Sequence, residues 1–281
     1  MNTEHNKLIS LLHLLDDDNE DVKKEVRTAF ENYGLMLEKD ITDLNYSLND
    51  DRIKPILDII WNNRRIWLKL QWSKTITIED EYLLLERGLE LLIKYDYGIK
   101  YNPNLSDRIK ELSFKYMKDN DDLNVLDLAN FLFIAEGYEG CKEDYYNPQN
   151  SNLDYVLTYK KGLPISLTIL FMLTAKNLGF RVEGCRFPGH FLAKAFIKDN
   201  YILIDCFNRG KIISDKELRL MAEESYESFL TIVKQKTTVK MILIRILSNL
   251  YKAYEIKGDI TNRDFFEELA LMIKSNLILE D

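Results

Sequence analysis

Hydrophobic residues recur at helical spacing in the first part of the chain and predict two short helices around an acidic turn. Residues 16–19 read Asp-Asp-Asp-Asn, and their side-chain oxygens can cap the second helix and complement its dipole. Gly34 predicts where that helix ends. The two apolar stripes consist of Leu8, Leu11, Leu12 and Leu15, and of Val22, Val26, Ala29 and Phe30.

The same two stripes resemble one HEAT-type helix pair. A solenoid needs several stacked repeats to bury a continuous core, and no second copy with the same period follows. An ordinary helical hairpin is therefore favoured over a repeat array. Residues 1–136 are expected to form a helical N-terminal unit with a HEAT-like first hairpin.

Longer helices are predicted over residues 51–72, 105–117 and 123–134. Another is expected to open at Thr77, where Asp80 stands three residues later as in a capping box, and to end near Gly98. The first of these helices carries three tryptophans, which suit either a partner surface or the core. Aromatic residues at helical spacing usually belong to the core, so that interpretation is favoured for Trp61, Trp67 and Trp72.

The hydrophobic period changes from helical to alternating in the middle of the chain. Residues 151–154 resemble a second capping box before a short helix, and Pro164 suits the first turn of an apolar helix that runs to residue 178. Strands are then predicted around 181–187, 191–197 and 201–207, with Asp199 and Asn200 as a turn. This pattern predicts an α+β fold that is predominantly helical, with a helix on a small antiparallel sheet.

Two further helices are predicted at the carboxyl end, separated by a break at Gly258. The first covers residues 239–254, and Thr261 or Asn262 is expected to cap the second. This hairpin is expected to pack on the core, and an exposed groove for a peptide remains an alternative. The predicted division is therefore 1–136, 137–236 and 237–281.

The charge balance and the absence of apolar signals narrow the classes of function. The chain has 38 basic and 46 acidic residues, a net charge of -8, which argues against nonspecific binding of nucleic acid. The N-terminus lacks an apolar signal core, and the longest apolar run, residues 163–175, is too short to span a bilayer. Three cysteines make no disulfide framework, so a cytoplasmic protein without membrane association is expected.

Four blocks of residues in the central region carry a family resemblance. They resemble, in this order, the SirB-type branch of the transglutaminase-like superfamily. The resemblance implies a transglutaminase-like core over residues 137–236, with helical extensions on both sides. The blocks are Tyr145-Tyr146-x-Pro148-x-Asn150-Ser151-x-Leu153, Lys161-Gly162-Leu163-Pro164-Ile165-Ser166-Leu167, Pro188-Gly189-His190-Phe191-Leu192 and Ile204-Asp205-x-Phe207-x-x-Gly210.

The resemblance implies a cysteine nucleophile at the start of the core helix, where the helix dipole and a histidine lower the thiol pKa. It also implies that His190 is the histidine and Asp205 the aspartate that orients it. No cysteine lies within residues 162–167. Ser166 is the nearest substitute, and a capping role for its hydroxyl is favoured over a nucleophilic one.

Contact between His190 and Asp205 depends on the turn between the last two predicted strands. A two-residue turn at Asp199 and Asn200 would put Lys194 opposite Asp205, with His190 on the order of 13 Å away along the strand. The family resemblance therefore predicts a longer loop, centred nearer Lys198, or a bulge. A pocket role and a structural role for His190 both stay open.

The three cysteines Cys141, Cys185 and Cys206 could supply a displaced thiol. Neither Cys185 nor Cys206 starts a predicted helix, so burial as small apolar residues is favoured. A zinc site from Cys185, His190 and Cys206 is disfavoured because it lacks a Cys-x-x-Cys element. No metal or cofactor is expected.

The leading hypothesis is a noncatalytic binding or regulatory protein, a pseudoenzyme whose cleft holds a protein or peptide partner. One rival is an acyl-transfer or amide-hydrolysing enzyme with a relocated Cys or Ser nucleophile. A purely structural helical scaffold is another. The candidate catalytic remnants are His190, Asp205 and Ser166, and the candidate pocket-lining residues are Tyr146, Asn150, Gly189, Cys185 and Cys206.

Overall fold

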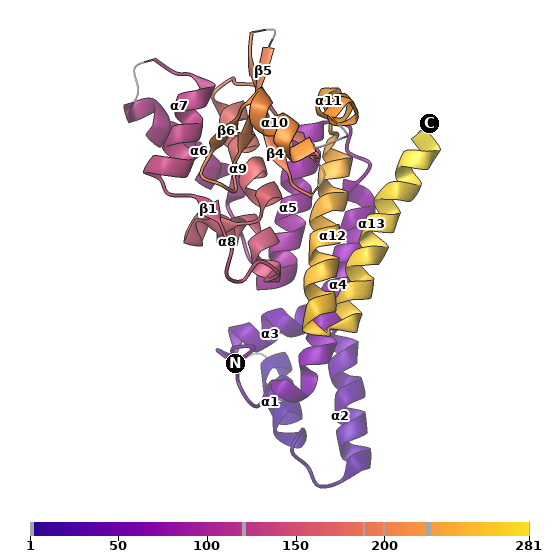
Figure 1. Cartoon of the computed structure of the whole chain (residues 1–281). Coiled ribbons are helices and arrows are strands. Elements are labelled where there is room, and N and C mark those ends of the chain that lie inside the picture. The colour runs from indigo at the N-terminus through magenta and orange to yellow at the C-terminus, as the bar shows by residue number, and fades with distance from the viewer. Residues whose placement is uncertain (1–2, 120–121, 188, 199, 223–225, 281) are drawn as a thin grey trace. The chain divides into compact units, whose positions relative to one another are not determined.

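The computed structural model describes residues 3–119, 122–187, 189–198, 200–222 and 226–280. Its chain divides into two compact units (Figure 1). Unit 1 comprises residues 1–73 and 94–102, and unit 2 comprises residues 74–93 and 103–281. The boundaries expected from the sequence, at 136/137 and 236/237, stay a prediction.

Unit 1 is helical and is built around one apolar core. Asn19 caps the second helix by accepting a hydrogen bond from the Asp21 amide, and Gly34 ends that helix with φ 53°, as expected. The HEAT-like character of this hairpin stays a prediction. The elements are α1 (Thr3–Leu14), α2 (Glu20–Tyr33), η1 (Gly34–Met36), α3 (Leu37–Asp43), η2 (Lys54–Ile56) and α4 (Leu57–Thr75). The core contains Leu8, Leu12, Val26, Phe30, Leu37, Ile41, Ile53, Ile56, Ile59 and Ile60.

A buried arginine joins three segments of unit 1. The side chain of Arg64 on α4 is 1% exposed and forms an ion pair with Glu38 on α3. Its Nη1 donates to the carbonyl oxygens of Tyr95 and Asp96, at 2.7 and 2.8 Å. These carbonyls lie in the last turn of α5 (Glu81–Tyr97), where helix carbonyls lack intrahelical partners. Trp61 covers the guanidinium, whose carbon lies 4.5 Å from the ring centroid.

The sequence predicts most helices of unit 2, although two that follow the larger sheet were not expected and three caps differ from the expectation. Asp80 rather than Thr77 caps α5, because its carboxylate accepts from the Leu83 amide. Asn152, rather than Ser151, caps α8. Asp259 accepts from the Asn262 amide at the start of the last helix, in place of Thr261 or Asn262. Between α5 and the larger sheet the helices are α6 (Leu105–Asp119), α7 (Val125–Asn130), the π-helical η3 (Phe131–Ala135), η4 (Pro148–Ser151), α8 (Leu153–Tyr159) and α9 (Pro164–Asn177).

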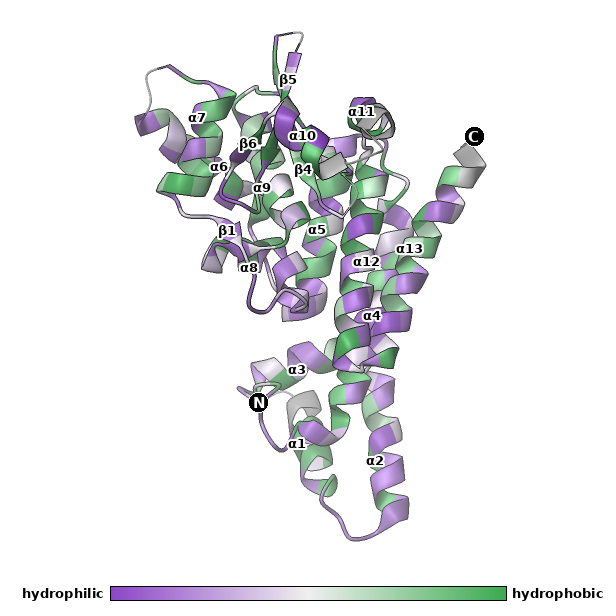
Figure 2. Ribbon diagram, in the orientation of Figure 1, coloured by the Kyte–Doolittle hydropathy of each residue, from purple (hydrophilic) through white to green (hydrophobic). Residues whose placement is uncertain are grey.

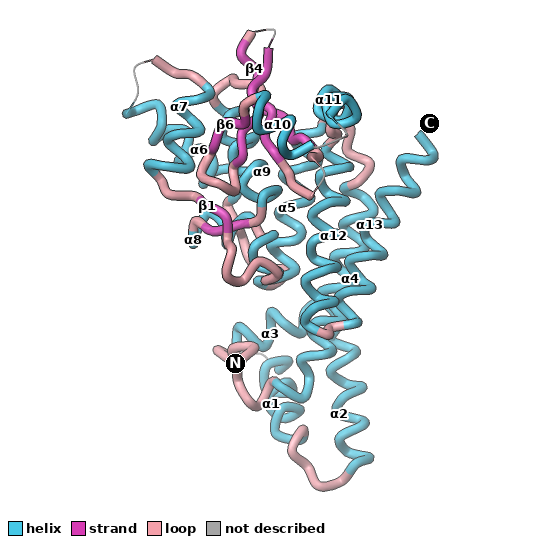
Figure 3. The backbone as a smooth tube through the Cα atoms, in the orientation of Figure 1, coloured by secondary structure: helices cyan, strands magenta, loops and turns pink. Residues whose placement is uncertain are grey.

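The protein has two small sheets, of which the larger lies after the predicted change of period (Figure 3). The larger is antiparallel with strand order β3-β4-β5-β6, and the smaller pairs β1 with β2 in parallel. The three strands predicted from alternation are present, whereas β1, β2 and β6 are too short to give a periodic signal. Their bounds are β1 (Glu139–Gly140), β2 (Lys161–Gly162), β3 (Val182–Cys185), β4 (Leu192–Ile197), β5 (Asn200–Asp205) and β6 (Lys211–Ile213).

Helices cover both faces of the larger sheet. Helix α9 packs against β3 and β4 on one face. The other face forms an apolar cluster with Leu218 of α10 (Asp215–Ala222) and Val233 of α11 (Tyr226–Lys234). Lys194 on β4 is buried beside this cluster, where it pairs with Glu183 at 3.2 Å and lies 3.4 Å from the Val233 carbonyl oxygen.

The carboxyl end is the predicted pair of helices, α12 (Val239–Lys257) and α13 (Ile260–Glu280). They pack against each other, and Gly258 ends α12 in the left-handed conformation. Figure 2 shows hydrophobic and hydrophilic residues distributed around both helices. Within the described residues, none of the helices is both long and apolar enough to cross a membrane.

Replacing Arg64 tests the contribution of this buried cation to unit 1. Arg64→Ala leaves Glu38 and two helix carbonyls without their partner, so the free energy of unfolding is expected to fall by about 3–5 kcal/mol. Urea titration followed by tryptophan fluorescence measures this change, since Trp61, Trp67 and Trp72 all lie in unit 1. The matched change Arg65→Ala is expected to cost less than about 0.5 kcal/mol. Equal losses would contradict this role.

Candidate histidine–aspartate site

The turn between β4 and β5 differs from the expected one. Ile197 pairs with Asn200, so Asn200 belongs to the strand and the predicted turn at Asp199 and Asn200 is wrong. Lys198 takes the left-handed conformation, with φ 53°, and Asp199 lies outside the described residues. The predicted longer loop is also wrong, because moving the short turn by one position is sufficient.

The observed register brings Asp205 near His190. Ala193 pairs with Ile204, so the next pair in the ladder sets position 192 opposite Asp205, two residues from His190. Nε2 of His190 then lies 2.9 Å from Oδ2 of Asp205. The His190 amide donates to the Phe187 carbonyl at 2.9 Å, which holds the histidine beside the start of β4. Pro188, part of the motif here, lies outside the described residues.

The carboxylate of Asp205 accepts hydrogen bonds from four donors. Oδ1 accepts from the amides of Phe207 and Asn208, each at 3.1 Å, and Oδ2 accepts from His190 and from Nδ2 of Asn208 at 2.7 Å. Burial raises the pKa of this carboxyl, but the hydrogen bonds from His190 and Asn208 outweigh burial and hold it below its ordinary value. Asp205 is therefore a carboxylate, and Nε2 of His190 carries a hydrogen.

An aromatic row, His190–Phe207–Tyr145–Tyr146, extends from the histidine. His190 meets Phe207 edge-on at 6.2 Å between ring centroids, Phe207 meets Tyr145 at 6.0 Å, and Tyr145 meets Tyr146 at 5.2 Å. Gly140 permits this arrangement, because a Cβ there would lie 2.4 Å from the Phe207 ring. The tyrosines are 36% and 49% exposed, so the row is accessible.

Phe207 and Asn208 were missed as site residues by the sequence reasoning. Phe207 stands two positions after Asp205 in the last motif block, and this spacing is the signal that points to it. Nothing in the sequence points to Asn208 as a site residue. Its role follows only from the turn after β5, which aims its side chain back at Asp205.

Ser166 lies at the start of α9, and within the described residues its hydroxyl has no hydrogen bond to His190. Its buried hydroxyl donates to the Asn150 carbonyl oxygen at 2.6 Å. That oxygen also accepts from the Leu163 amide at 3.3 Å. The hydroxyl therefore ties η4 to α9 instead of accepting from a free helix amide, and the expected capping role is wrong.

The remaining candidate residues lie in separate environments. Asn150 is buried, and its Nδ2 donates to the Asp144 carbonyl at 2.6 Å. Gly189 is exposed, with φ 72°. Tyr146 lines a cavity of about 40 Å³ with Lys252 of α12. A larger surface cavity of about 500 Å³ lies on Asp205, beside Asn208 and the Lys211–Glu217 ion pair.

Two cysteines are buried on opposite sides of the sheet. Cys185 belongs to the cluster under α10 and α11, and burial raises the pKa of its thiol to about 11. Burial also raises the pKa of the Cys206 thiol, which the Thr168 hydroxyl on α9 lowers by less. Across the part of the chain that the structure describes, no group of three His, Cys, Asp or Glu residues could hold a metal ion.

Thiol reactivity distinguishes these cysteines from a catalytic nucleophile. In the native protein at neutral pH, iodoacetamide is expected to modify Cys141, which is partly exposed, and to spare Cys185 and Cys206. Mass spectrometry of the peptides checks the pattern, and alkylation in denaturant shows that all three thiols are free to react. Fast modification of Cys185 or Cys206 at mildly acidic pH would contradict it.

The lowered pKa of Asp205 predicts a pH-dependent contribution to stability. Asp205→Asn places an amide nitrogen against the donors of His190 and Asn208 and is expected to cost about 1–3 kcal/mol at neutral pH. Because the folded pKa is lowered, the carboxylate stabilises the fold above its ordinary pKa of about 3.9 and loses that effect as pH falls through the lowered value. Urea unfolding at several pH values should show the gap narrowing in acid. For Asp107→Asn, at an exposed position, no such gap is expected.

Known proteins are similar to this chain over more than half of its length. A family model described as the transglutaminase-like superfamily matches residues 100–248. Two UPF0162 proteins from strains of Xylella fastidiosa are 31% identical over 195 residues, which is 65% of this chain and 69% of each relative. F-box only protein 21 of Mus musculus is 32% identical over 193 residues, covering 65% of this chain and 30% of that protein. No solved structure matches the chain.

The matched region contains the core helix, the sheet, and the His190–Asp205 pair at its edge. It covers more than half of the chain, and the chain in turn covers more than two thirds of the UPF0162 relatives. The resemblance carried by the four motif blocks is thereby confirmed. The chain belongs to the transglutaminase-like superfamily.

Proposed function

We propose that this chain is a noncatalytic binding or regulatory protein whose transglutaminase-like core holds a protein or peptide partner. The observation that carries the proposal is the hydrogen bond of Ser166, whose hydroxyl donates to the Asn150 carbonyl oxygen and not to a catalytic base. No thiol lies within residues 162–167, so the histidine has no nucleophile there to activate. The reducing, cytoplasmic setting expected from the cysteines is part of this proposal, and no cofactor is required.

The His190–Asp205 pair can serve recognition without catalysis. Since Asp205 only accepts hydrogen bonds, the hydrogen of a neutral His190 is on Nε2, and Nδ1 is an acceptor. The described residues provide no hydrogen-bond partner for Nδ1, and the His190 side chain is 17% exposed. A backbone N–H of a bound peptide is the donor that such a fixed acceptor suits.

The aromatic row gives the same site a contact surface. Tyrosine supplies a large rigid contact area, and interfaces are enriched in it. The row is anchored at Phe207, whose carbonyl accepts from the Gly140 amide at 3.0 Å. Tyr146 then presents its exposed ring beside Lys252, so the row and the histidine together offer stacking and one directed hydrogen bond.

Selection from a displayed peptide library on the full-length protein tests this site. Selected peptides are expected to bind Tyr146→Ala and His190→Ala at least about 10-fold more weakly, because each change removes a central contact. Tyr159→Ala is the matched control, since Tyr159 is an exposed tyrosine of α8 outside the row. Fluorescence anisotropy gives the affinities, and equal affinities for all variants would contradict the proposal.

An enzyme assay tests the opposite outcome. The native protein is expected to show no hydrolysis or transfer of glutamine-amide and acyl-ester substrates above the level of His190→Ala. Ser166→Ala is expected to behave like the native protein in this assay, whereas a serine nucleophile would make it inactive. Turnover that disappears in His190→Ala would replace the binding role with that of an acyl-transfer or amide-hydrolysing enzyme.

A further inference from the structure

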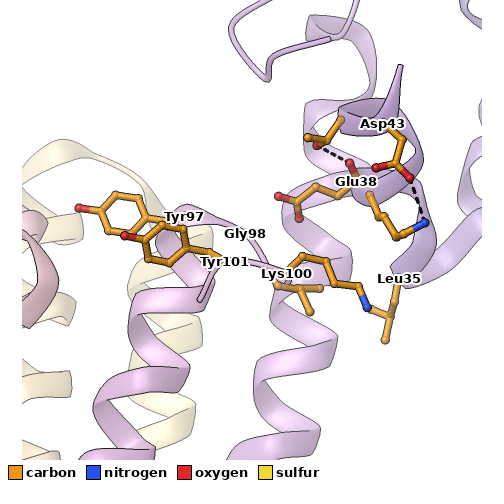
Figure 4. A pocket seen from close by; sticks show the side chains of 10 residues that line it. Leu35, Glu38, Asp43, Tyr97, Gly98, Lys100 and Tyr101 are labelled. Carbon is orange, nitrogen blue, oxygen red and sulfur yellow. Dashed lines mark hydrogen bonds and ion pairs between the residues drawn. The ribbon is translucent and has the colours of Figure 1, made fainter. Parts of the chain in front are cut away.

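A second candidate site lies entirely within unit 1. A cavity of about 280 Å³ opens between α3 and the segment that follows α5 (Figure 4). Most of its lining residues precede residue 100, outside the region that the family model matches. Its apolar walls come from Leu35, Tyr97, Ile99 and Tyr101. The two tyrosine rings lie side by side, with centroids 5.0 Å apart.

The floor of this cavity is held in place by buried polar contacts. Gly98 turns the chain with φ 117°, and a Cβ there would lie 2.6 Å from Oε1 of Glu38. The turn is closed by the Tyr101 amide, which donates to the Gly98 carbonyl at 2.9 Å. Arg64 holds Glu38 in place, because its Nε donates to Oε2 of Glu38 at 3.0 Å. The walls are therefore preformed, as in most small-molecule sites.

The charges of the lining leave one cation uncompensated. Glu38 is paired with Arg64, and Asp43 is paired with Lys39 at 3.0 Å. Lys100 has no ion-pair partner among the residues that the structure describes. Figure 4 shows its side chain extending toward Leu35, next to the apolar walls. The pocket thus combines an apolar interior with one unmatched positive charge.

We propose that this pocket binds a small organic carboxylate with an apolar aryl or alkyl body. The volume lies just below the range of about 300–1,000 Å³ typical of ligand pockets, which suits a small ligand of about a dozen non-hydrogen atoms. The apolar body packs against Tyr97, Tyr101 and Leu35, and the carboxylate faces Lys100. Glu38 and Asp43 do not repel it, because each already has its own cation.

A titration with two matched probes tests the assignment on the full-length protein. The probes are 4-phenylbutyrate and its neutral amide, 4-phenylbutanamide, followed by shifts of the backbone amide signals in NMR. For a probe of about a dozen non-hydrogen atoms, a Kd of about 1 mM is expected for the carboxylate. Shifts should be confined to residues 35–43 and 97–101, and the amide should bind more weakly.

Variants separate the charge from the apolar walls. Lys100→Gln is expected to lower the affinity for 4-phenylbutyrate about 3-fold, which is the effect of losing one exposed ion pair. The affinity for the amide should not change. Leu35→Ser should weaken the binding of both probes. Lys24→Gln, a change at an exposed lysine of α2 away from the pocket, should leave the binding of both probes unchanged. Absence of saturable binding, or an equal effect of the two lysine changes, overturns the proposal. So does a phenylalanine-ended peptide that binds more than about 10-fold tighter, which would assign the pocket to a peptide terminus.

Discussion

The carboxylate of Asp205 organises the edge of the transglutaminase-like core. Its four donors come from the histidine before β4 and from the turn after β5. The same turn places Phe207 against Gly140 and so connects the sheet to β1. The orientation of His190, the start of the aromatic row and the end of β5 thus depend on one buried anion, which is stable because every donor around it is satisfied.

Local signals in the sequence were sufficient for most of the longer elements, whereas the residues of the pair were identified through the family resemblance of the motif blocks. Helical periodicity located α12, the apolar run that opens at Pro164 located α9, and alternation located β3, β4 and β5. The predicted turn lies one position too late, because Asp and Asn adopt left-handed conformations readily, whereas in the protein Lys198 adopts one. The register instead follows the packing of β4 and β5 and the contact of Asp205 with His190, which no local pattern encodes.

Other features depend on residues that are far apart along the chain. The hydroxyl of Ser166 meets the Asn150 carbonyl because η4 folds back on α9, so a helix-start pattern gave it the wrong role. The cavity of unit 1 joins residues 35–43 to residues 97–101. The cap of α5 was also mispredicted, although only nearby residues are involved. The Thr77 hydroxyl donates to the preceding turn, and Asp80 takes the capping position.

Two buried cations use the same chemistry in different units. Arg64 binds carbonyls in the last turn of α5, and Lys194 approaches those at the end of α11, and each also pairs with one carboxylate. The negative end of a helix and a nearby acid together compensate a cation withdrawn from water. In both places the cation therefore connects a helix end to a residue on another element.

The contact between Ser166 and Asn150 bears on how this scaffold could change its chemistry over evolutionary time. A thiol is a weaker hydrogen-bond donor than a hydroxyl, so a cysteine at position 166 would loosen η4 from α9 while leaving its own sulfur buried. Gain of a thiol at this helix start is therefore expected to cost stability through the loss of one buried hydrogen bond.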